Sequence, residues 1–396
     1  MGKITEVNGL RGVAILYVLY EHLHLGHPPP WRDATLPEAD DLGLGFFAKA
    51  PFWNGWLAVN LFFVLSGFVL FLPYASRQRA LETWGHLREY YTRRASRLLP
   101  LFYFAVTVCI AFVEPFHGVW KTTKELALDL TGLFSFTPQY FWPPCNSVLW
   151  SLGVEIWFCI FFPLIAISFL RLGVKRTVII CALVALTTRL LSITVLPKSW
   201  IIELHISAFK DCVFGRVDDF VIGMAVAALY VKGVFRHPLI AAGCLAGGVT
   251  LVWLGMILWN LEMCGILPEW SRAFFNIPIN VGFAAILFAI LNEKLPDWIR
   301  SLFRNPFLQL CGVMCYSIYV WHFVILVRFA HRSHSPATLF IYFALVIFIA
   351  ILSYRFIEFG DVKDWKKLFP MFFTPKRKKP ESPTGLPENA IATPTS

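Results

Sequence analysis

The sequence predicts an all-α integral membrane protein, built as a single bundle of about ten transmembrane helices. Hydrophobic residues make up 57% of the 396 residues and charged residues only 15%, whereas about a quarter of the residues in a soluble domain are charged. Apolar runs of the length that crosses a bilayer once recur along the chain. This composition excludes an ordinary soluble globular protein and favours one membrane domain.

The apolar runs are bounded by charged residues or by clusters of Pro and Gly, which places the end of each expected helix. The expected spans are 8–25, 56–75, 98–114, 147–170, 177–196, 217–231, 238–259, 273–292, 307–330 and 337–357. The first run follows only Lys3 and lacks a cleavage site, so we expect a retained helix and not a signal peptide. The run from Leu126 to Phe136 is too short to span and predicts a re-entrant or interfacial helix.

The distribution of basic residues predicts the orientation. If the N-terminus is cytoplasmic, the internal segments and the tail contain 22 Lys and Arg residues, and the external loops contain nine. This excess is what the positive-inside rule requires, so both termini are expected in the cytoplasm. It also accounts for the net charge of +10 without a nucleic-acid partner. The expected location is the cell membrane, which is the inner membrane in a Gram-negative cell.

The chain divides into an expected membrane domain, 1–370, and a basic cytoplasmic tail, 371–396. The tail is rich in Pro, Ser, Thr and Lys, which predicts disorder, and its KRKK run is expected to contact anionic membrane lipids. The nine cysteines have no zinc-like spacing, and no metal site, Walker motif or dinucleotide fingerprint is expected. A disulfide among Cys145, Cys212 and Cys264 stays open, since all three fall in expected external loops.

The first expected helix carries two polar residues on one face, Arg11 and His22. Eleven residues at 100° each make three turns and about 20°, and they separate the two side chains by about 16 Å along the axis. An ionisable group inside a membrane is costly, which makes both residues functional candidates. Alternatively, Arg11 extends to the cytoplasmic headgroups and His22 lies at an interfacial helix end.

The internal segment RQRALETWGHLREYYTRRASRL contains six arginines and no lysine, and Arg94 and Arg97 are among them. The positive-inside rule needs basic residues here but does not prefer Arg. The planar guanidinium group suits bidentate binding of phosphate, so a phosphorylated cytoplasmic ligand is one interpretation. The other interpretation is that these arginines serve only to keep the segment on the cytoplasmic side.

In WSLGVEIWF, Ser151 and Glu155 lie one helical turn apart at the outer end of an expected span, at the expected depth of His22. A carboxylate commonly orients a histidine base, so Glu155 is expected to support His22 as a second catalytic residue. A structural ion pair is the alternative. Ser151 is a candidate for substrate binding.

Two further segments carry polar groups near the expected outer face. In YSIYVWHF, His322 is either a second titratable group at the site or a hydrogen-bonded core histidine. In FGRVDDFVIGM, Arg216 and Asp218 either bind a polar acceptor or pair with neighbouring charges. Ser66 lacks a G-x-S-x-G context, and Ser66 and Gly67 are expected to let two helices approach closely.

Several segments together resemble one family, the membrane-bound acyltransferase 3 family, typified by O-acetyltransferases of bacterial surface glycans. The similar segments are NGLRGVAILYVLYEH at 8–22, AVNLFFVLSGFVL at 58–70, RRASRLLPLFY at 93–103, WSLGVEIWF at 150–158, GRVDDFVIGM at 215–224, YSIYVWHF at 316–323 and YRFIE at 354–358. They cover nearly the whole chain in order. Arg11, His22, Arg94 and Arg97 match the family's signature, and Glu21 departs from it, since an apolar or aromatic residue is expected beside the histidine.

The resemblance implies transfer of an acyl group, usually acetyl, from cytoplasmic acyl-coenzyme A to a hydroxyl of a carbohydrate or glycolipid. It implies that Arg11, Arg94 and Arg97 meet the phosphates of coenzyme A and that His22 acts as the general base. Coenzyme A is then a donor substrate, and no tightly bound cofactor is expected. Without the resemblance, two other functions stay open: a transporter of an acylated or glycosylated molecule, which uses the buried charges as a relay, and a non-catalytic partner in an envelope assembly.

Overall fold

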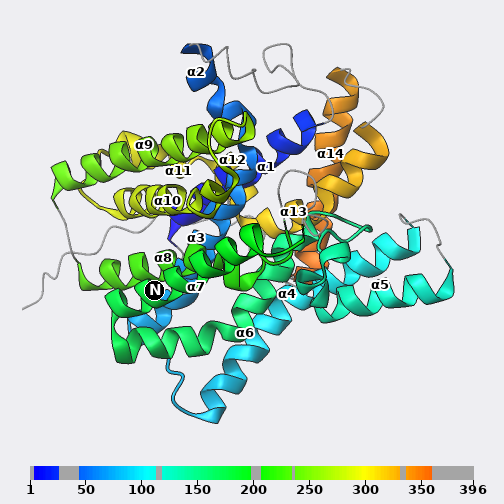
Figure 1. The fold of residues 1–396 in the computed structure, drawn as a ribbon, viewed down its shortest axis with the longest axis horizontal. Helices are drawn as coiled ribbons and strands as arrows, with labels where there is room; N and C mark the ends of the chain where they lie inside the picture. The colour runs from blue at the N-terminus through cyan, green and yellow to red at the C-terminus, as the bar shows by residue number, and fades with distance from the viewer. Residues whose placement is uncertain are drawn as a thin grey trace, which may run out of the picture.

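The computed structural model describes residues 4–25, 44–112, 118–197, 207–233, 237–330 and 336–358, and these are all helix, turn or loop without a strand. The expected all-α class is therefore confirmed (Figure 1). The helices are α1 (Thr5–Leu25), α2 (Leu44–Trp53), α3 (Ala58–Ala75), α4 (Trp84–Phe112), α5 (Val119–Thr131), α6 (Leu149–Leu172), α7 (Val174–Thr194), α8 (Val213–Lys232), α9 (Pro238–Met263), α10 (Asn276–Leu291), α11 (Asp297–Phe303), α12 (Pro306–Val313), α13 (Cys315–Ile325) and α14 (Pro336–Ser353). The expected tail, 371–396, lies outside the described residues.

The protein is a multi-pass membrane protein. Seven helical segments in the described part are long and apolar enough to cross a membrane, and the bent pair α12 and α13 would make an eighth span. The helices α1 and α8 are not in that count. Each carries several charged residues: Glu6, Arg11 and Glu21 in α1, and Arg216, Asp218, Asp219 and Lys232 in α8. All ten expected segments nevertheless fall on helices, and the count of ten and the side of the termini stay predictions.

Three boundaries differ from the expected ones. The helix α4 begins at Trp84, so most of the arginine-rich segment expected to be an internal loop is helical. The expected ninth span, 307–330, is not straight, because α12 and α13 meet at an angle of 78°. The helix α5 begins seven residues before the expected Leu126, and it is followed by a 3-10 turn at Leu133–Phe136.

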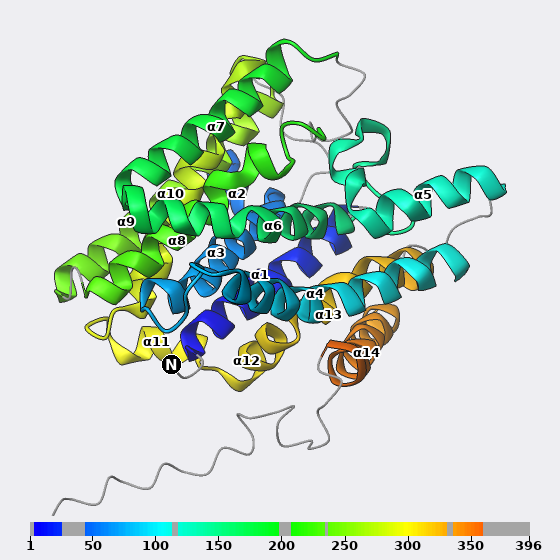
Figure 2. The ribbon, with the colours of Figure 1, turned by 90° about the horizontal axis from the view of Figure 1, so that it is seen from below.

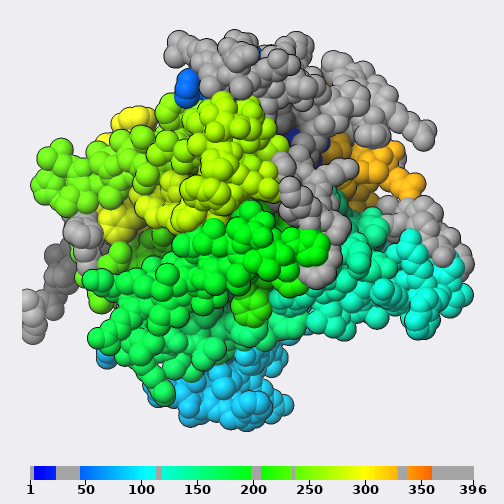
Figure 3. All heavy atoms as spheres, viewed as in Figure 1, coloured from blue at the N-terminus to red at the C-terminus, as the bar shows by residue number. Residues whose placement is uncertain are grey.

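Outward-facing side chains on the long helices are largely apolar, as expected for a surface that contacts lipid tails. On α7, Ile180 and Leu183 are about half exposed, and on α9 Leu239 and Val249 are more than half exposed. Both helices present surface in the space-filling view (Figure 3).

The helix α1 runs through the middle of the bundle, beside α3, α12 and α13 (Figure 2). Close backbone packing holds it there. A Cβ atom on Gly312 of α12 would lie 1.8 Å from the carbonyl oxygen of Asn8 on α1. This contact requires glycine and presses α12 directly onto α1, which fixes where α13 can start.

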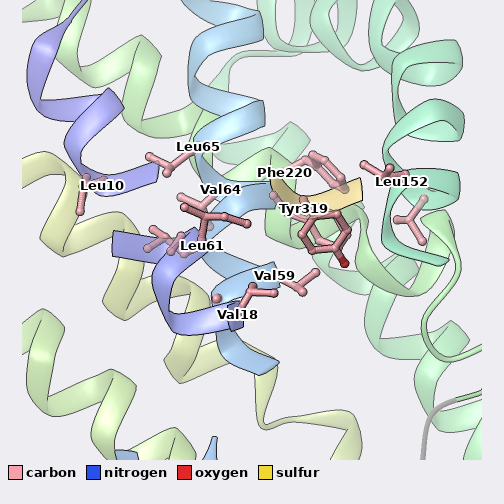
Figure 4. Packing of buried hydrophobic residues seen from close by; sticks show 14 of the residues in the cluster. Leu10, Val18, Val59, Leu61, Val64, Leu65, Leu152, Phe220 and Tyr319 are labelled. Atoms are coloured by element: carbon pink, nitrogen blue, oxygen red, sulfur yellow. The ribbon is translucent and has the colours of Figure 1, made fainter. Parts of the chain in front are cut away.

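The helices α3 and α8 form a second close pair. A Cβ atom on Gly67 would lie 1.9 Å from the carbonyl oxygen of Phe220, and one on Gly223 would lie 1.9 Å from that of Val64. The expected role of Gly67 in close helix approach is therefore confirmed. Figure 4 shows Val64 and Leu65 of α3 in the same apolar core as Leu10 and Val18 of α1.

The cysteines are all free thiols. The disulfide left open among Cys145, Cys212 and Cys264 is absent. Cys145 is buried beside α5, where its thiol donates to Oδ2 of Asp129 at 3.5 Å.

Candidate functional site

A pocket opens between α1, α3, α4, α6 and α13. Its polar wall brings together five residues that the sequence singled out: Arg11, Arg94, Arg97, Ser151 and Glu155. The rest of the lining is Val59, Phe62, Phe63, Ser66, Val69, Leu70, Leu98, Leu152, Cys315, Tyr316 and Tyr319. Figure 4 shows Val59 and Leu152 in the apolar part of this wall, near Tyr319.

Three guanidinium groups give the pocket a positive charge. Arg94 and Arg97 are three residues apart on α4, so they share a face, and Arg11 projects from α1 into the same pocket. Against these three cations the lining has a single carboxylate, Glu155, which leaves a formal charge of 3 − 1 = +2. The arrangement suits an anionic ligand.

The donors of these arginines are only partly used. The Nε of Arg94 is buried without a hydrogen-bond acceptor, and neither Arg11 nor Arg97 hydrogen-bonds or pairs with another described residue. A buried donor without an acceptor is rare in a folded protein. Several N–H groups are therefore available to phosphate oxygens.

Glu155 belongs to this arginine pocket. Its Oε1 accepts a hydrogen bond from Oγ of Ser66 at 2.8 Å and lies 3.6 Å from NH2 of Arg94. The expected contact of Glu155 with His22 is not among the polar contacts of either residue in the described chain. The sequence placed the two at one depth, but Glu155 points toward α3 and α4.

The lining of the pocket also contains a pair of hydroxyl groups. The Oγ of Ser151 lies 2.7 Å from the hydroxyl of Tyr319, and both side chains are buried. The tyrosine donates its own hydrogen to the carbonyl oxygen of Val148 at 3.0 Å, which leaves its oxygen to accept from Ser151. This pair closes the pocket between α6 and α13.

Behind Tyr319 lie the two histidines, which the fold brings together from opposite ends of the chain. Nδ1 of His22 lies 3.0 Å from the carbonyl oxygen of Val18 and 3.3 Å from Nε2 of His322. Nδ1 of His322 lies 2.7 Å from the carbonyl oxygen of Tyr319. His322 is fully buried, whereas His22 is partly exposed.

Glu21 points to a different neighbour from His22. Its carboxylate accepts a hydrogen bond from the backbone N–H of Gly55 at 3.0 Å, and the side chain is buried. It thus anchors the turn before α3 to α1, which accounts for the departure from the family pattern in structural terms.

The structure places Arg216 and Asp218 outside the pocket, in a buried ionic network. Arg216 lies 3.4 Å from both Asp211 and Asp219, and Asp218 pairs with Arg189 at 2.5 Å. Pairing with neighbouring charges was one of the two interpretations of Arg216 and Asp218 from the sequence. A role in binding the acceptor stays a prediction for both.

Two residues just before α8, outside the expected span 217–231, add one more pair to this network. Nζ of Lys210 lies 2.9 Å from Oδ2 of Asp211. Burial alone would raise the pKa of the Asp211 carboxyl, but Lys210 and Arg216 hold that pKa below its ordinary value. The network contains three cations and three carboxylates (Arg189, Lys210, Arg216; Asp211, Asp218, Asp219), so it is neutral overall.

Sequence reasoning did not single out Tyr319, Arg189, Lys210 or Asp211, and it gave Ser66 a packing role only. Ser66 and Tyr319 stand inside segments that resemble the family, so each could have been listed as a hydroxyl near a charged motif. Arg189 offered a plainer signal, because it is a lone arginine within an expected apolar span.

Comparison with known proteins decides the family. The model of an acyltransferase domain matches residues 4–355, nearly the whole described chain. The chain belongs to the acyltransferase 3 family. The matched range includes every residue that lines the pocket and both histidines, since all of them fall within residues 11–322.

The acyltransferase 3 chain is similar to several named proteins. It is 26% identical over 389 residues to "Putative O-acetyltransferase SACOL0978" of Staphylococcus aureus (strain COL), a match that covers 90% of this chain and 57% of the relative. Peptidoglycan O-acetyltransferase OatA of Listeria monocytogenes is 23% identical, in a match that covers 90% of this chain and 55% of the relative. Acyltransferase MdmB of Streptomyces mycarofaciens is 26% identical over 299 residues, in a match that covers 70% of this chain and 70% of the relative. The chain thus spans little more than half of the length of the first of these relatives. No solved structure matches it.

Proposed function

We propose that this protein is a membrane-bound O-acyltransferase. It moves an acyl group, acetyl in the simplest case, from cytoplasmic acyl-coenzyme A to a hydroxyl of a surface polysaccharide, its lipid-linked precursor or another glycoside. The proposed location is the cell membrane. The observation that carries the proposal is one pocket in which Arg11, Arg94 and Arg97 face an apolar wall that ends at Tyr319, with the histidine pair behind it.

The donor end is the arginine cluster. Coenzyme A carries phosphate groups, and guanidinium groups bind phosphate through two parallel N–H donors. The buried, unused Nε of Arg94 and the net positive lining fit such a ligand. The acyl-pantetheine arm would then follow the apolar residues Val59, Phe62 and Leu152 toward Tyr319.

The reaction needs a base for the acceptor hydroxyl, and His22 is the proposed one. Its Nε2 takes the hydroxyl proton while the oxygen attacks the thioester carbonyl carbon and forms the new C–O bond. The C–S bond then breaks, and the departing thiolate takes the proton back from His22. A positioned acid–base group of this kind contributes about 10²- to 10⁴-fold to the rate.

The names of relatives support the acceptor class. One is a peptidoglycan O-acetyltransferase, and another is an acyltransferase of a Streptomyces species. Aromatic side chains near the C-terminal end of α1 also suit a sugar ring: Trp56 and Trp259 lie with ring centroids 4.6 Å apart. A carbohydrate is therefore the first acceptor class to test.

The deciding experiment uses the full chain in lipid nanodiscs with acetyl-coenzyme A and a panel of glycans. We expect release of coenzyme A thiol together with an acetyl ester on the glycan, detected by mass spectrometry. The variant His22→Ala should lose both signals, while Arg93→Ala should keep them, because Arg93 pairs with Glu89 away from the pocket. Transport of a labelled glycan into vesicles without acetylation would favour the transporter instead.

A further inference from the structure

We propose that His322 is the positioning residue of His22, in the place that a carboxylate takes in hydrolytic triads. The inference rests on the proposed function, because it concerns how the proposed base is held. It follows from the direct contact between the two imidazoles and from the position of Glu155 at the other side of the pocket.

The backbone carbonyls fix which ring nitrogen of each histidine carries a hydrogen. A carbonyl oxygen only accepts, so Nδ1 of His22 must donate to Val18, and Nδ1 of His322 must donate to Tyr319. In the neutral rings each Nε2 then has a lone pair. The single Nδ1 hydrogen of His22 is shared between two acceptors, the carbonyl oxygen of Val18 at 3.0 Å and Nε2 of His322 at 3.3 Å. Nε2 of His22 is left to accept a proton from the acceptor hydroxyl.

This assignment is consistent throughout the pair, whereas the reverse one is not. If Nε2 of His322 carried the hydrogen and donated to His22, each Nδ1 would turn a lone pair toward a carbonyl oxygen at 3.0 and 2.7 Å. Two repulsive contacts would replace two hydrogen bonds. The geometry therefore holds His22 in the tautomer that a general base requires.

His322 is also rigid enough to orient its neighbour. It is fully buried, and its ring packs edge-on against His22, with centroids 4.9 Å apart and planes at 68°. Phe323, the next residue of α13, makes a second edge contact with His22, with ring centroids 5.3 Å apart. The base thus has one ring orientation, set by α13.

The contact also stabilises the charged form of the base during the reaction. When Nε2 of His22 takes the hydroxyl proton, its Nδ1–H becomes a stronger donor, and Nε2 of His322 is the neutral acceptor that faces it. The proton stays on His22 and returns to the departing thiolate. Glu155 has no part in this step, since its contacts are Ser66 and Arg94.

The test compares His322→Ala and His322→Gln in nanodiscs, with acetyl-coenzyme A and the most reactive glycan of the panel. The Gln side chain reaches the place of Nε2 and offers an amide oxygen as acceptor. We expect His322→Ala to lower kcat roughly 10- to 100-fold, as loss of an orienting partner does, with little change in KM for acetyl-coenzyme A. His322→Gln should recover most of the lost kcat.

The control is Ser353→Ala, which removes the 2.6 Å hydrogen bond from the neighbouring Trp321 without touching the histidine pair. It should leave kcat near that of the wild type. Unchanged binding of acetyl-coenzyme A to each variant, measured by titration, shows that the fold is intact.

The outcomes distinguish failure of the positioning role of His322 from failure of the proposed function. If His322→Ala binds acetyl-coenzyme A and turns over like the wild type while His22→Ala is inactive, His322 does not position the base, although the proposed function stands. The same holds if Gln fails to recover activity and Ser353→Ala loses as much. If His22→Ala itself acetylates normally, the proposed base is wrong.

Discussion

Arg94→Ala tests most directly whether the arginine pocket binds the donor. The side chain has 17% of its surface exposed and lies 3.6 Å from Glu155, so it is largely removed from water. A charge-assisted hydrogen bond in such a setting contributes about 1.5–3 kcal/mol, and each 1.4 kcal/mol is about tenfold in affinity. We expect KM for acetyl-coenzyme A to rise roughly 10- to 100-fold, with kcat almost unchanged.

A second substitution makes the prediction sharper. Arg94→Ala leaves the carboxylate of Glu155 without its cation in the pocket, and this carboxylate then repels an anionic donor. Adding Glu155→Gln removes that charge, so the formal charge of the lining returns from +1 to +2. The double variant should therefore recover part of the affinity lost in Arg94→Ala. If Glu155 instead supported His22, the second substitution would lower kcat and recover nothing.

The assay is steady-state thiol release at varied acetyl-coenzyme A in nanodiscs, together with direct titration of acetyl-coenzyme A, which needs no acceptor. Arg93→Ala is the matched control, because Arg93 is the adjacent arginine on α4 and forms an exposed pair with Glu89. A pair of that kind contributes about 0–1 kcal/mol, so KM should stay within about fivefold. A loss of kcat at constant KM in Arg94→Ala, or an equal rise of KM in Arg93→Ala, refutes the assignment of the donor end.

Three other results are expected. His22→Ala should lower kcat about 10²- to 10⁴-fold without weakening the binding of acetyl-coenzyme A measured by titration, and a weaker donor affinity would contradict separate roles. Gly67→Ala should prevent stable folding, judged by size-exclusion chromatography, whereas Gly243→Ala should not, since a Cβ atom there meets nothing within 4 Å. Burial would raise the pKa of Glu6, but the hydrogen bond and charge of Arg304 hold that pKa below its ordinary value. The carboxylate therefore stabilises the fold above about pH 4.3 and loses that effect as the pH falls. The difference in Tm between wild type and Glu6→Gln should shrink on acidification, and a difference that stays constant with pH would contradict this role of Glu6.

The arginine cluster, which we propose as the donor end, was predictable from the sequence because its signals are local. Arg94 and Arg97 are three residues apart on one helix, so their common face follows from helical geometry alone. Arg11 stands out as a charge within an apolar run. Joining the two sets required only that α1 and α4 pack near each other at the same depth.

The partner of His22 was not predictable in the same way. Rise per residue gives the depth of a side chain but not the direction in which it points across the bundle, and Glu155 turns toward Ser66 and Arg94. The position of His322 depends on the 78° bend between α12 and α13. Next to that bend, Gly312 packs on the backbone of Asn8, and no local pattern in the sequence reveals this contact between distant segments.

The same contact joins the packing of the bundle to its chemistry. Along α1, the interval from Arg11 to His22 is about 16 Å, and the pocket between them is bounded by residues of α3, α4, α6 and α13. Since α12 is pressed onto the first half of α1, the bend delivers α13 to the second half, where Tyr319 faces the pocket and His322 faces His22. A side chain at Gly312 would push α12 outward and separate the histidines while the arginines stay on α1 and α4. The proposed separation of donor and base roles therefore depends on how these helices pack.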